Sequence, residues 1–380
     1  MSTKYRKPIA LLLLPLMLGL SFAPAYAQGE GMGFTTYYFS DSGGNSVTTT
    51  AFNLAKKILN RTVFLLDLEV DNVYVPPVTA TTGATRPKRQ SAKPFEKTRG
   101  QAILGLEQGL GANGAVAFNL YRSQEVDYNS SSAILTLTRE LNQKNTVFTL
   151  RGQYLVDEVG KILDNGDIEK QDKNSIWAVA NLSQILSPTT VFDLGYDVLY
   201  HEGFLSDPYR QVKVFDANNA FTLAQEKHPA MRTRHAVTGK LSQMIPEVRA
   251  SLSGSYRFYF DDWQVSSHTA EVQLNKYVFS DLIVKFNYRY YTQTGASFYR
   301  EKYSGAEYLN ESYRTADYKL RPFNSNNFGF SLALLFRGLA ESNPDLQFLE
   351  KTSIEARYFR YFNTLDFSAN ILQLNVNFGL

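Results

Sequence analysis

Few side chains in this 380-residue chain have the types and spacing that catalysis requires. Ser266 and His268 lie two residues apart, so on an extended strand they share one face. A serine nucleophile beside a histidine base can hydrolyse an ester when the two side chains come within hydrogen-bond reach. No orienting acid or amide can be assigned to this pair, because the preceding predicted strand supplies Phe258 and Phe260. We therefore expect no enzyme, and keep a surface hydrolase as the minor alternative.

Two further groups of polar residues have less specific spacing. Asp261 and Asp262 resemble a paired-carboxylate site, but they lie at a predicted hairpin tip, where aspartate commonly stabilises the turn. The histidines and the carboxylate near one long predicted loop are His201, Glu202, His228 and His235. Their spacing matches no metal-binding pattern, and the chain has no cysteine for a thiolate site. We expect no metal ion and no other cofactor.

A larger set of charged residues falls at alternate positions of predicted strands, which places them on the inner wall of a barrel. The acidic members are Asp67, Glu69, Glu107, Asp193, Asp197 and Glu271, and the basic members are Arg151, Lys240, Arg257, Lys285, Arg289 and Arg357. The first candidates for a role in selectivity are Arg257, Glu271, Lys285, Arg289, Asp193, Asp197 and Arg151. The alternative is a charged ladder that only braces the wall. The mixture of signs predicts no preference for anions or cations.

The expected hairpins also predict which of these charges are neighbours. A short turn after the strand that carries Arg257 places this residue beside Thr269 and diagonal to Glu271. A turn centred on Val278 would place Glu271 opposite Lys285. We therefore expect cross-strand pairs of opposite charge on the inner wall.

The elements that must position these residues are β-strands, because apolar and polar residues alternate with period two along most of the chain. In the last segment, for example, Leu372, Leu374 and Val376 alternate with Gln373 and Asn375. The segments with this pattern lie near 61–71, 99–109, 113–122, 131–140, 145–156, 175–185, 189–200, 233–243, 249–261, 265–275, 279–292, 325–337, 351–361 and 368–380. We predict a transmembrane antiparallel up-and-down β-barrel of about fourteen strands, with twelve or sixteen also allowed. The alternative is a soluble β-sandwich or barrel.

Loop lengths support the membrane barrel over the soluble fold. In a bacterial barrel both termini lie in the periplasm, periplasmic turns are short and surface loops are long. The long connections are expected at 71–98, 157–174, 201–232 and 293–324. Their alternation with tight links favours an even number of strands. The basic stretch at 76–97 is a candidate contact for lipopolysaccharide phosphates, although a solvated loop is the simpler interpretation.

The N-terminal residues predict export. Basic residues at 4–7, an apolar run at 9–22 and the A-x-A motif ending at Ala27 are typical of a signal peptide, with Gln28 as the first mature residue. We therefore divide the chain into a cleavable signal peptide (1–27), an N-terminal periplasmic or plug-like segment (28–60) and an outer-membrane barrel (61–380). Within the N-terminal segment, residues 34–39 are a candidate strand and residues 51–59 have amphipathic helical spacing.

Several segments rich in tyrosine, arginine and aspartate are distinctive. They are residues 200–210, 228–229 with Arg232 and Arg234, 256–263, 288–293, 298–299 and 313–320, and a small-residue motif at 82–85 accompanies them. These segments resemble a family of uncharacterised bacterial outer-membrane proteins that is known only as a domain of unknown function. The resemblance spans most of the mature chain, implies an outer-membrane barrel and supplies no activity.

The sequence therefore predicts a porin-like protein of the Gram-negative outer membrane, exported through the periplasm. Our first hypothesis is a pore or transport protein for small polar solutes without a strong charge preference. The alternatives are a scaffold barrel that docks a periplasmic partner and the surface hydrolase. Expected partners are outer-membrane lipid and lipopolysaccharide, with the barrel-assembly machinery and periplasmic chaperones during biogenesis. A net charge of +3 gives no reason to expect nucleic-acid binding.

Overall fold

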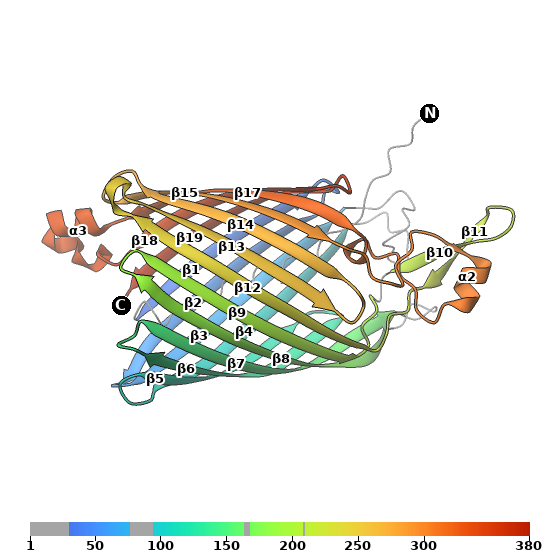
Figure 1. The fold of residues 1–380 in the computed structure, drawn as a ribbon, viewed down its shortest axis with the longest axis horizontal. Coiled ribbons are helices and arrows are strands. Elements are labelled where there is room, and N and C mark those ends of the chain that lie inside the picture. Colours follow the sequence, from blue (N-terminus) through green and yellow to red (C-terminus); the bar gives the residue numbers. More distant parts are fainter. Residues whose placement is uncertain (1–29, 77–93, 163–167, 208–209) are drawn as a thin grey trace.

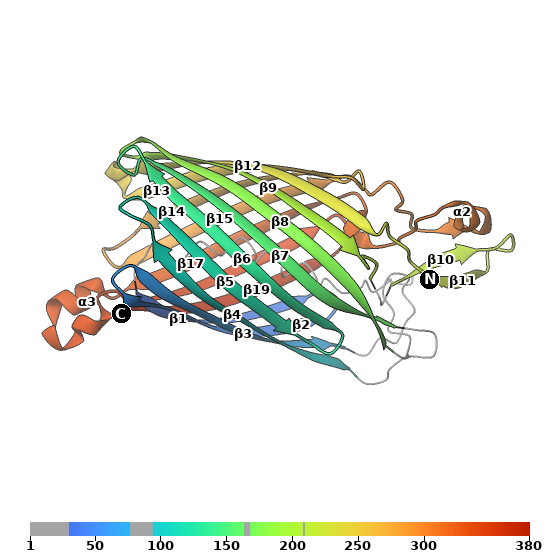
Figure 2. The same ribbon diagram turned by 90° about the horizontal axis from the view of Figure 1, so that it is seen from below.

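The computed structural model describes residues 30–76, 94–162, 168–207 and 210–380. In these residues, sixteen antiparallel strands form a closed barrel whose strands run obliquely to its long axis (Figure 1, Figure 2). The strands are β1 (Gly31–Asp41), β2 (Ser46–Leu59), β3 (Thr62–Val75), β4 (Phe95–Gly109), β5 (Gly114–Gln124), β6 (Tyr128–Leu141), β7 (Thr146–Ile162), β8 (Ile168–Ser187), β9 (Thr190–Gly203), β12 (Met231–Ile245), β13 (Ala250–Asp261), β14 (Ser266–Tyr277), β15 (Leu282–Gln293), β17 (Phe323–Leu335), β18 (Ser353–Asn363) and β19 (Ser368–Gly379). The all-β antiparallel barrel is confirmed, but the expected count of about fourteen is two strands short.

The alternation of residue types explains why these segments form a barrel wall. In β17, Phe328, Phe330 and Leu332 are exposed on the outer face, whereas Asn327 and Ser331 at the alternate positions are buried on the inner face. An apolar outer face and a polar inner face are what a barrel surrounded by lipid requires. No helix among the described residues is long and apolar enough to cross a membrane.

The two additional strands come from the region assigned to a periplasmic or plug-like segment. Residues 31–59 form β1 and β2, so the boundary at residue 61 is wrong. The candidate strand at 34–39 lies within β1, whereas the helical spacing at 51–59 falls in β2. Small residues on the inner face of β2 weaken the alternation there and leave a helical spacing of the larger residues. Moreover, β1 pairs with β19, from Gly31 opposite Gly379 to Asp41 opposite Ala369. Local sequence cannot reveal a pairing between residues so far apart.

The ends of the barrel differ in the length of their connections. One end, here called the turn end, carries tight links and a helical segment made of α3 (Arg337–Ser342) and η4 (Pro344–Leu349). The other end carries the long connections (Figure 1). The long loop expected at 157–174 is wrong, because β7 and β8 remain paired as far as Ile162 opposite Ile168. The signal peptide, its cleavage site and residues 77–93 lie outside the described residues.

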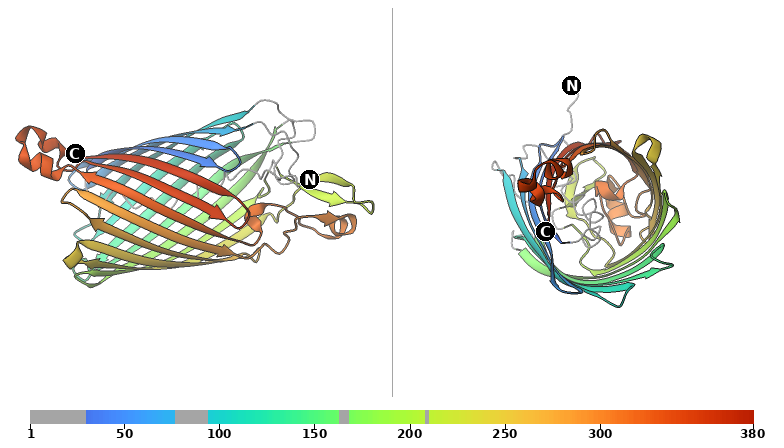
Figure 3. Two further views of the ribbon diagram at one scale, coloured as in Figure 1. Left: turned by 90° about the horizontal axis from the view of Figure 1, so that it is seen from above. Right: turned by 90° about the vertical axis from the view of Figure 1, so that its left-hand side faces the viewer.

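Two of the long connections form a folded unit, here called the cap: residues 204–207, 210–230 and 294–322. The elements of the cap are β10 (Gln211–Phe215), β11 (Phe221–Gln225), β16 (Tyr303–Ser304), α2 (Gly305–Asn310) and η3 (Tyr318–Leu320). Strand β10 pairs antiparallel with β11 and parallel with β16, which joins the two connections in one small sheet. Viewed along the barrel axis, the cap lies within the outline of the barrel (Figure 3, right). The cap therefore covers part of the mouth at this end.

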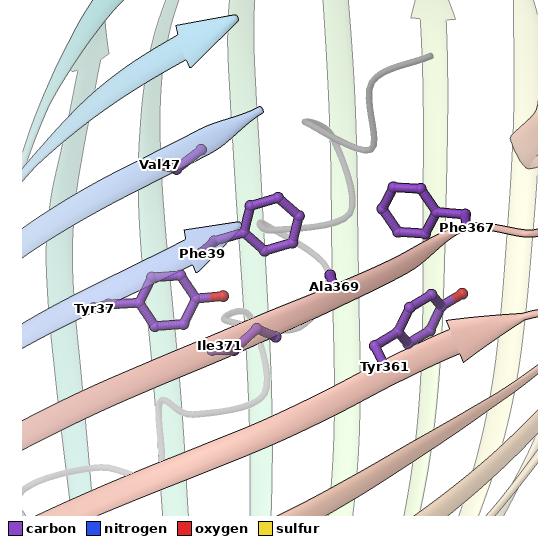
Figure 4. Close-up of a cluster of buried hydrophobic side chains, with 7 residues drawn as sticks. All are labelled: Tyr37, Phe39, Val47, Tyr361, Phe367, Ala369 and Ile371. Carbon is purple, nitrogen blue, oxygen red and sulfur yellow. The ribbon is translucent and has the colours of Figure 1, made fainter. Parts of the chain in front are cut away.

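The seam where the first and last strands meet is packed on its inner side by an apolar cluster. Figure 4 shows these residues gathered on one side of the seam. They are Tyr37, Phe39, Val47, Tyr361, Phe367, Ala369 and Ile371, all less than 9% exposed. Neighbouring outward residues such as Leu372 are 52% exposed. The barrel is therefore closed by side-chain packing as well as by the β1–β19 hydrogen bonds.

We expect Ile371→Val to destabilise the barrel by about 1 kcal/mol, because it removes one buried methylene from the packed seam. Urea unfolding in lipid vesicles, followed by circular dichroism, measures the loss. Leu372→Val is the matched control on the neighbouring outward position. An equal loss in the two variants would contradict a packed seam.

Candidate functional site

The inner wall of the barrel carries all the residues that the sequence predicted to face the lumen. In β15, Phe286 and Tyr290 are exposed on the outer face, so Lys285 and Arg289 point inward. The same alternation places the other predicted residues inside: Arg257, Glu271, Asp193, Asp197 and Arg151. The prediction of their face is therefore correct.

Two ion pairs lie near the middle of this wall. The Arg289 Nε donates to Glu271 Oε2 at 2.7 Å, and Arg257 Nη2 lies 3.7 Å from Asp197 Oδ1. The four side chains keep between 24% and 30% of their surface exposed. Each pair thus retains access to solvent from the lumen, so these charges remain available to a passing solute.

The expected partner of Glu271 was wrong, although the register of the preceding hairpin was right. Arg257 lies opposite Thr269 as predicted. Glu271, however, lies opposite Arg289, and Lys285 lies opposite Asn275. The reason is that β14 continues to Tyr277, so the turn is centred beyond Val278.

The remaining predicted residues have other contacts. Lys285 Nζ lies 2.8 Å from Glu355 Oε1, and Arg357 donates to the other oxygen of Glu355 at 2.6 Å. The Arg151 guanidinium lies 5.2 Å from the centre of the Trp177 ring. Asp193 faces Lys240 in the register of β9 and β12, and the two form no ion pair in the described structure.

Strand β3 carries a row of carboxylates on the inner face, from Asp67 through Glu69 to Asp71. Arg99 on β4 donates to Asp71 through Nε at 2.7 Å and to Glu69 through Nη2 at 3.4 Å. Thr49 donates to Asp71 at 2.5 Å. Period-two spacing in the sequence predicted the inward direction of Asp67 and Glu69. Asp71 and Arg99 lie at the same spacing, at the edges of the predicted strands, and were not predicted to face the lumen.

A second group of polar residues lies where the inner wall meets the cap. Lys173 Nζ lies 3.0 Å from the buried Asp157, and Ser175 Oγ lies 2.6 Å from His201 Nδ1. Arg232 Nε donates to Asp261 Oδ2 at 3.0 Å, and both residues are buried. These contacts join neighbouring strands of the barrel at the end that carries the cap.

An aromatic cluster forms the base of the cap. The ring of His228 lies 5.1 Å from that of Trp263 and 5.7 Å from that of Phe298. The Arg232 guanidinium lies 4.2 Å from the centre of the Trp263 ring. Trp263 Nε1 donates to the carbonyl oxygen of Met231 at 2.9 Å. The turn between β13 and β14 is therefore one point at which the cap is attached to the barrel.

Buried charges tie the two connections of the cap together. Arg210 is 3% exposed and donates through Nε to Asp207 at 2.8 Å and through Nη1 to Asp317. Burial alone would lower the pKa of Arg210, but Asp317 and Asp207 raise it above its ordinary value. Burial lowers the pKa of the neighbouring Lys319 to about 8. The resulting arrangement links parts of the chain that are 107 residues apart.

Glu226 makes a second set of contacts within the cap. Its carboxylate accepts hydrogen bonds from the backbone nitrogen of Asp207 at 2.9 Å and from Thr315 Oγ1 at 2.8 Å. His228 Nε2 lies 3.2 Å from the same carboxylate. No pattern in the sequence predicted a role for Glu226. The segments at 200–210, 228–229 and 313–320 stood out for their composition, but no spacing pattern showed that they meet.

Residues 27–378 match the model of a family described as "Protein of unknown function (DUF3570)". The chain belongs to this family. The predicted membership of a domain-of-unknown-function family is thus confirmed. No curated protein matches the chain.

Solved structures similar to this DUF3570 chain include OccK1 (OpdK) of Pseudomonas aeruginosa, with 8% identity over 92% of this chain and 97% of that chain and a TM-score of 0.44. A BenF-like porin from Pseudomonas fluorescens Pf-5 has 8% identity over 93% of this chain and 98% of that chain, with a TM-score of 0.45. A loop-deletion mutant of OmpT, an outer membrane protein of Vibrio cholerae, has 10% identity over 92% and 97%, with a TM-score of 0.42. Because these identities are 10% or lower and these TM-scores are below 0.5, no function is inferred for this chain from these structures.

In this DUF3570 protein, the residues considered in the sequence for catalysis or metal binding contact side chains other than one another. Ser266 Oγ lies 3.4 Å from Thr294 Oγ1, and His268 Nδ1 lies 2.5 Å from the Tyr256 hydroxyl. The loop histidines are likewise separated, His201 on the inner wall, His228 in the cap and His235 on the outer face. Among the residues the structure describes, no group of three or more histidines and carboxylates could hold a metal ion. Asp261 and Asp262 each accept a backbone hydrogen bond near the turn, from Val265 and Thr233 respectively.

Proposed function

We propose that this protein is an outer-membrane pore or transport protein for small polar solutes, without a strong preference for either sign of charge. The observation that supports a channel is the inner wall of a closed sixteen-strand barrel, on which Asn181 and Lys240 point inward and remain exposed. Barrels of sixteen strands or more are wide enough to leave an aqueous channel. The close balance of acidic and basic residues on this wall supports the absence of a strong charge preference.

We further propose that the turn end faces the periplasm and the cap faces the outside of the cell. Short periplasmic turns and long surface loops are the usual arrangement, and the first residue of β1 and the last residue of β19 lie together at the turn end. In this orientation the outer wall contacts lipid and lipopolysaccharide. Export by the N-terminal signal peptide, with help from periplasmic chaperones and the barrel-assembly machinery, belongs to the same proposal, and no catalytic role is part of it.

A scaffold function is the second candidate. Leu339 and Phe348 in the helical segment at the turn end are 45% and 68% exposed, which would suit contact with a periplasmic partner. The N-terminal segment is unsuitable for docking, because residues 31–59 belong to the barrel wall.

We expect the full-length protein to give steady single-channel currents in planar bilayers. In a gradient of potassium chloride, the permeabilities of the two ions should agree within about threefold, because inner charges of both signs act on each ion. The reversal potential measures this ratio. A folded, heat-modifiable protein that gives no current in any preparation would refute the pore and favour the scaffold.

A further inference from the structure

The inner wall of the barrel separates its charges into two opposed regions. The first, here called the acidic column, consists of Asp67, Glu69 and Asp71 on β3. Arg99 contacts Glu69 and Asp71, so these two charges are partly compensated. Asp67 makes no ion pair or hydrogen bond within the described part of the chain. The column therefore presents net negative charge to the lumen.

The second region, here called the basic arc, lies on β12, β13 and β15. Its members are Arg232, Arg234, Lys240, Arg257, Lys285 and Arg289. Most have carboxylate partners, which are Asp261, Asp197, Glu355 and Glu271. Arg234 and Lys240 form no ion pair in the ranges that the structure describes, and the buried Nε of Arg234 has no acceptor. Asp193 lies opposite Lys240 in the register of β9 and β12. When Asp193 is counted with the four carboxylate partners, the six basic residues of the arc exceed the carboxylates by one, so the arc keeps a small net positive charge.

The order of strands places these two regions on opposite sides of the lumen. Going round the barrel from β3 to β13, the strands between them are β4, β5, β6, β7, β8, β9 and β12 in one direction and β2, β1, β19, β18, β17, β15 and β14 in the other. The two strands are thus diametrically opposed. The two regions also lie at a similar depth in the barrel. Asp71, Arg257 and Arg289 each lie four residues before the residue at which their strand ends on the cap side.

Opposed regions of unlike charge create an electric field across the lumen, and the low-dielectric wall concentrates it. A simple ion is attracted to the wall of opposite charge and repelled by the wall of like charge. A molecule that carries both an ammonium and a carboxylate group is aligned by the field, and each of its charged groups faces the wall of opposite sign. Alignment of this kind offsets part of the cost of losing hydration water in the pore.

We propose that the solutes favoured by this barrel are small zwitterions, molecules of amino-acid type that carry one ammonium and one carboxylate group. This inference rests on the proposed pore function and specifies its substrate class. The acidic column and the basic arc act together, since neither alone distinguishes a zwitterion from a simple ion.

The test compares two solutes of the same shape, L-serine and its uncharged analogue glyceramide, in swelling of vesicles that contain the full-length protein. We expect serine to enter about threefold faster than glyceramide after subtraction of protein-free vesicles, because only serine is aligned by the field. The double variants Asp67→Asn with Glu69→Gln and Arg234→Gln with Lys240→Gln should each bring the ratio of the two rates close to one. Arg122→Gln, which removes an exposed charge from the outer face of β5, is the matched control and should keep the ratio.

The outcomes separate this inference from the pore function. If glyceramide and serine enter wild-type vesicles at equal rates, the pore stands and the zwitterion preference is refuted. If only the basic-arc variant changes the ratio and the reversal potential shows selectivity for chloride, the lumen is an anion pathway and the inference is also overturned. If neither solute enters, both proposals fail. Heat-modifiability of each variant on a gel verifies that it is folded, and the acidic-column variant provides an independent test if the basic-arc variant does not assemble.

Discussion

Deletion of residues 212–226 is expected to raise the single-channel conductance at least about twofold, because it removes material that lies across one mouth of the lumen. The deletion takes away all of β11 and all of β10 except Gln211, the hairpin through which the connection at 204–230 enters the small sheet of the cap. In the view along the barrel axis the cap lies within the outline of the barrel (Figure 3, right). Ions that now pass around or through the cap would then meet only the inner wall.

The increase in conductance should be large, because the deletion removes the hairpin itself and also the side-chain packing that holds the rest of the cap together. Val212 and Tyr303 are 0% and 1% exposed and form the centre of a small core that joins the two connections. Without β10 this core cannot form, and the deletion also removes Glu226, which accepts hydrogen bonds from Asp207 and Thr315. The connection at 294–322 thereby loses the contacts that hold it over the mouth.

The matched control is a shorter deletion at the tip of the same hairpin, residues 216–220, which are exposed and lie outside the core of the cap. Planar-bilayer recordings of the two deletions and the intact protein should show the increase only for the longer deletion. Equal conductance of all three would mean that the cap does not restrict the pore. A closed intact protein and a conducting long deletion would identify the cap as a gate.

Period-two alternation was enough to find most of the barrel, because lipid on one side and polar surroundings on the other impose opposite residue types on adjacent positions. Thus the strand ending at Gly379 was placed almost to the residue. Strand β2 was missed where small residues such as Ala51 and Ala55 occupy the inner face and remove the contrast, and β1 was predicted only as a short strand at 34–39 outside the barrel. Where the alternation is weak, a strand forms because it pairs with a neighbouring strand. For β1 that neighbour is β19, the last strand of the chain.

The candidate site was predictable only in part for the same reason. Facing direction follows from the alternation, so the inward direction of Arg257, Arg289 and Asp193 could be predicted. Pairing depends on where each turn begins, and a longer β14 gave Glu271 a different partner. The contacts of Arg210 with Asp317 and the opposition of β3 and β13 depend on the whole barrel. No local pattern contains that information.

Arg232→Ala is expected to destabilise the protein by about 3–5 kcal/mol, the usual cost of leaving one partner of a buried ion pair without compensation. Arg232 and Asp261 are 8% and 9% exposed, and Arg232 contacts the same carboxylate oxygen through Nε and Nη2. In the variant, Asp261 would keep the hydrogen bond from the Tyr259 hydroxyl at 2.5 Å but lose its only ion pair in the described structure. Urea unfolding of the protein in lipid vesicles, followed by circular dichroism, measures the loss.

Arg257→Ala on the adjacent strand is the matched control, since Arg257 and its partner Asp197 are 3.7 Å apart and partly exposed to the lumen. Such a pair contributes about 0–1 kcal/mol to stability, because water in the lumen can solvate the carboxylate that remains. A second comparison separates the ion pair from the packing of Arg232 on Trp263. Arg232→Met with Asp261→Leu removes both charges and keeps side-chain volume, so it should be less destabilising than Arg232→Ala alone. Equal destabilisation by Arg232→Ala and Arg257→Ala would show that the buried pair does not secure the base of the cap.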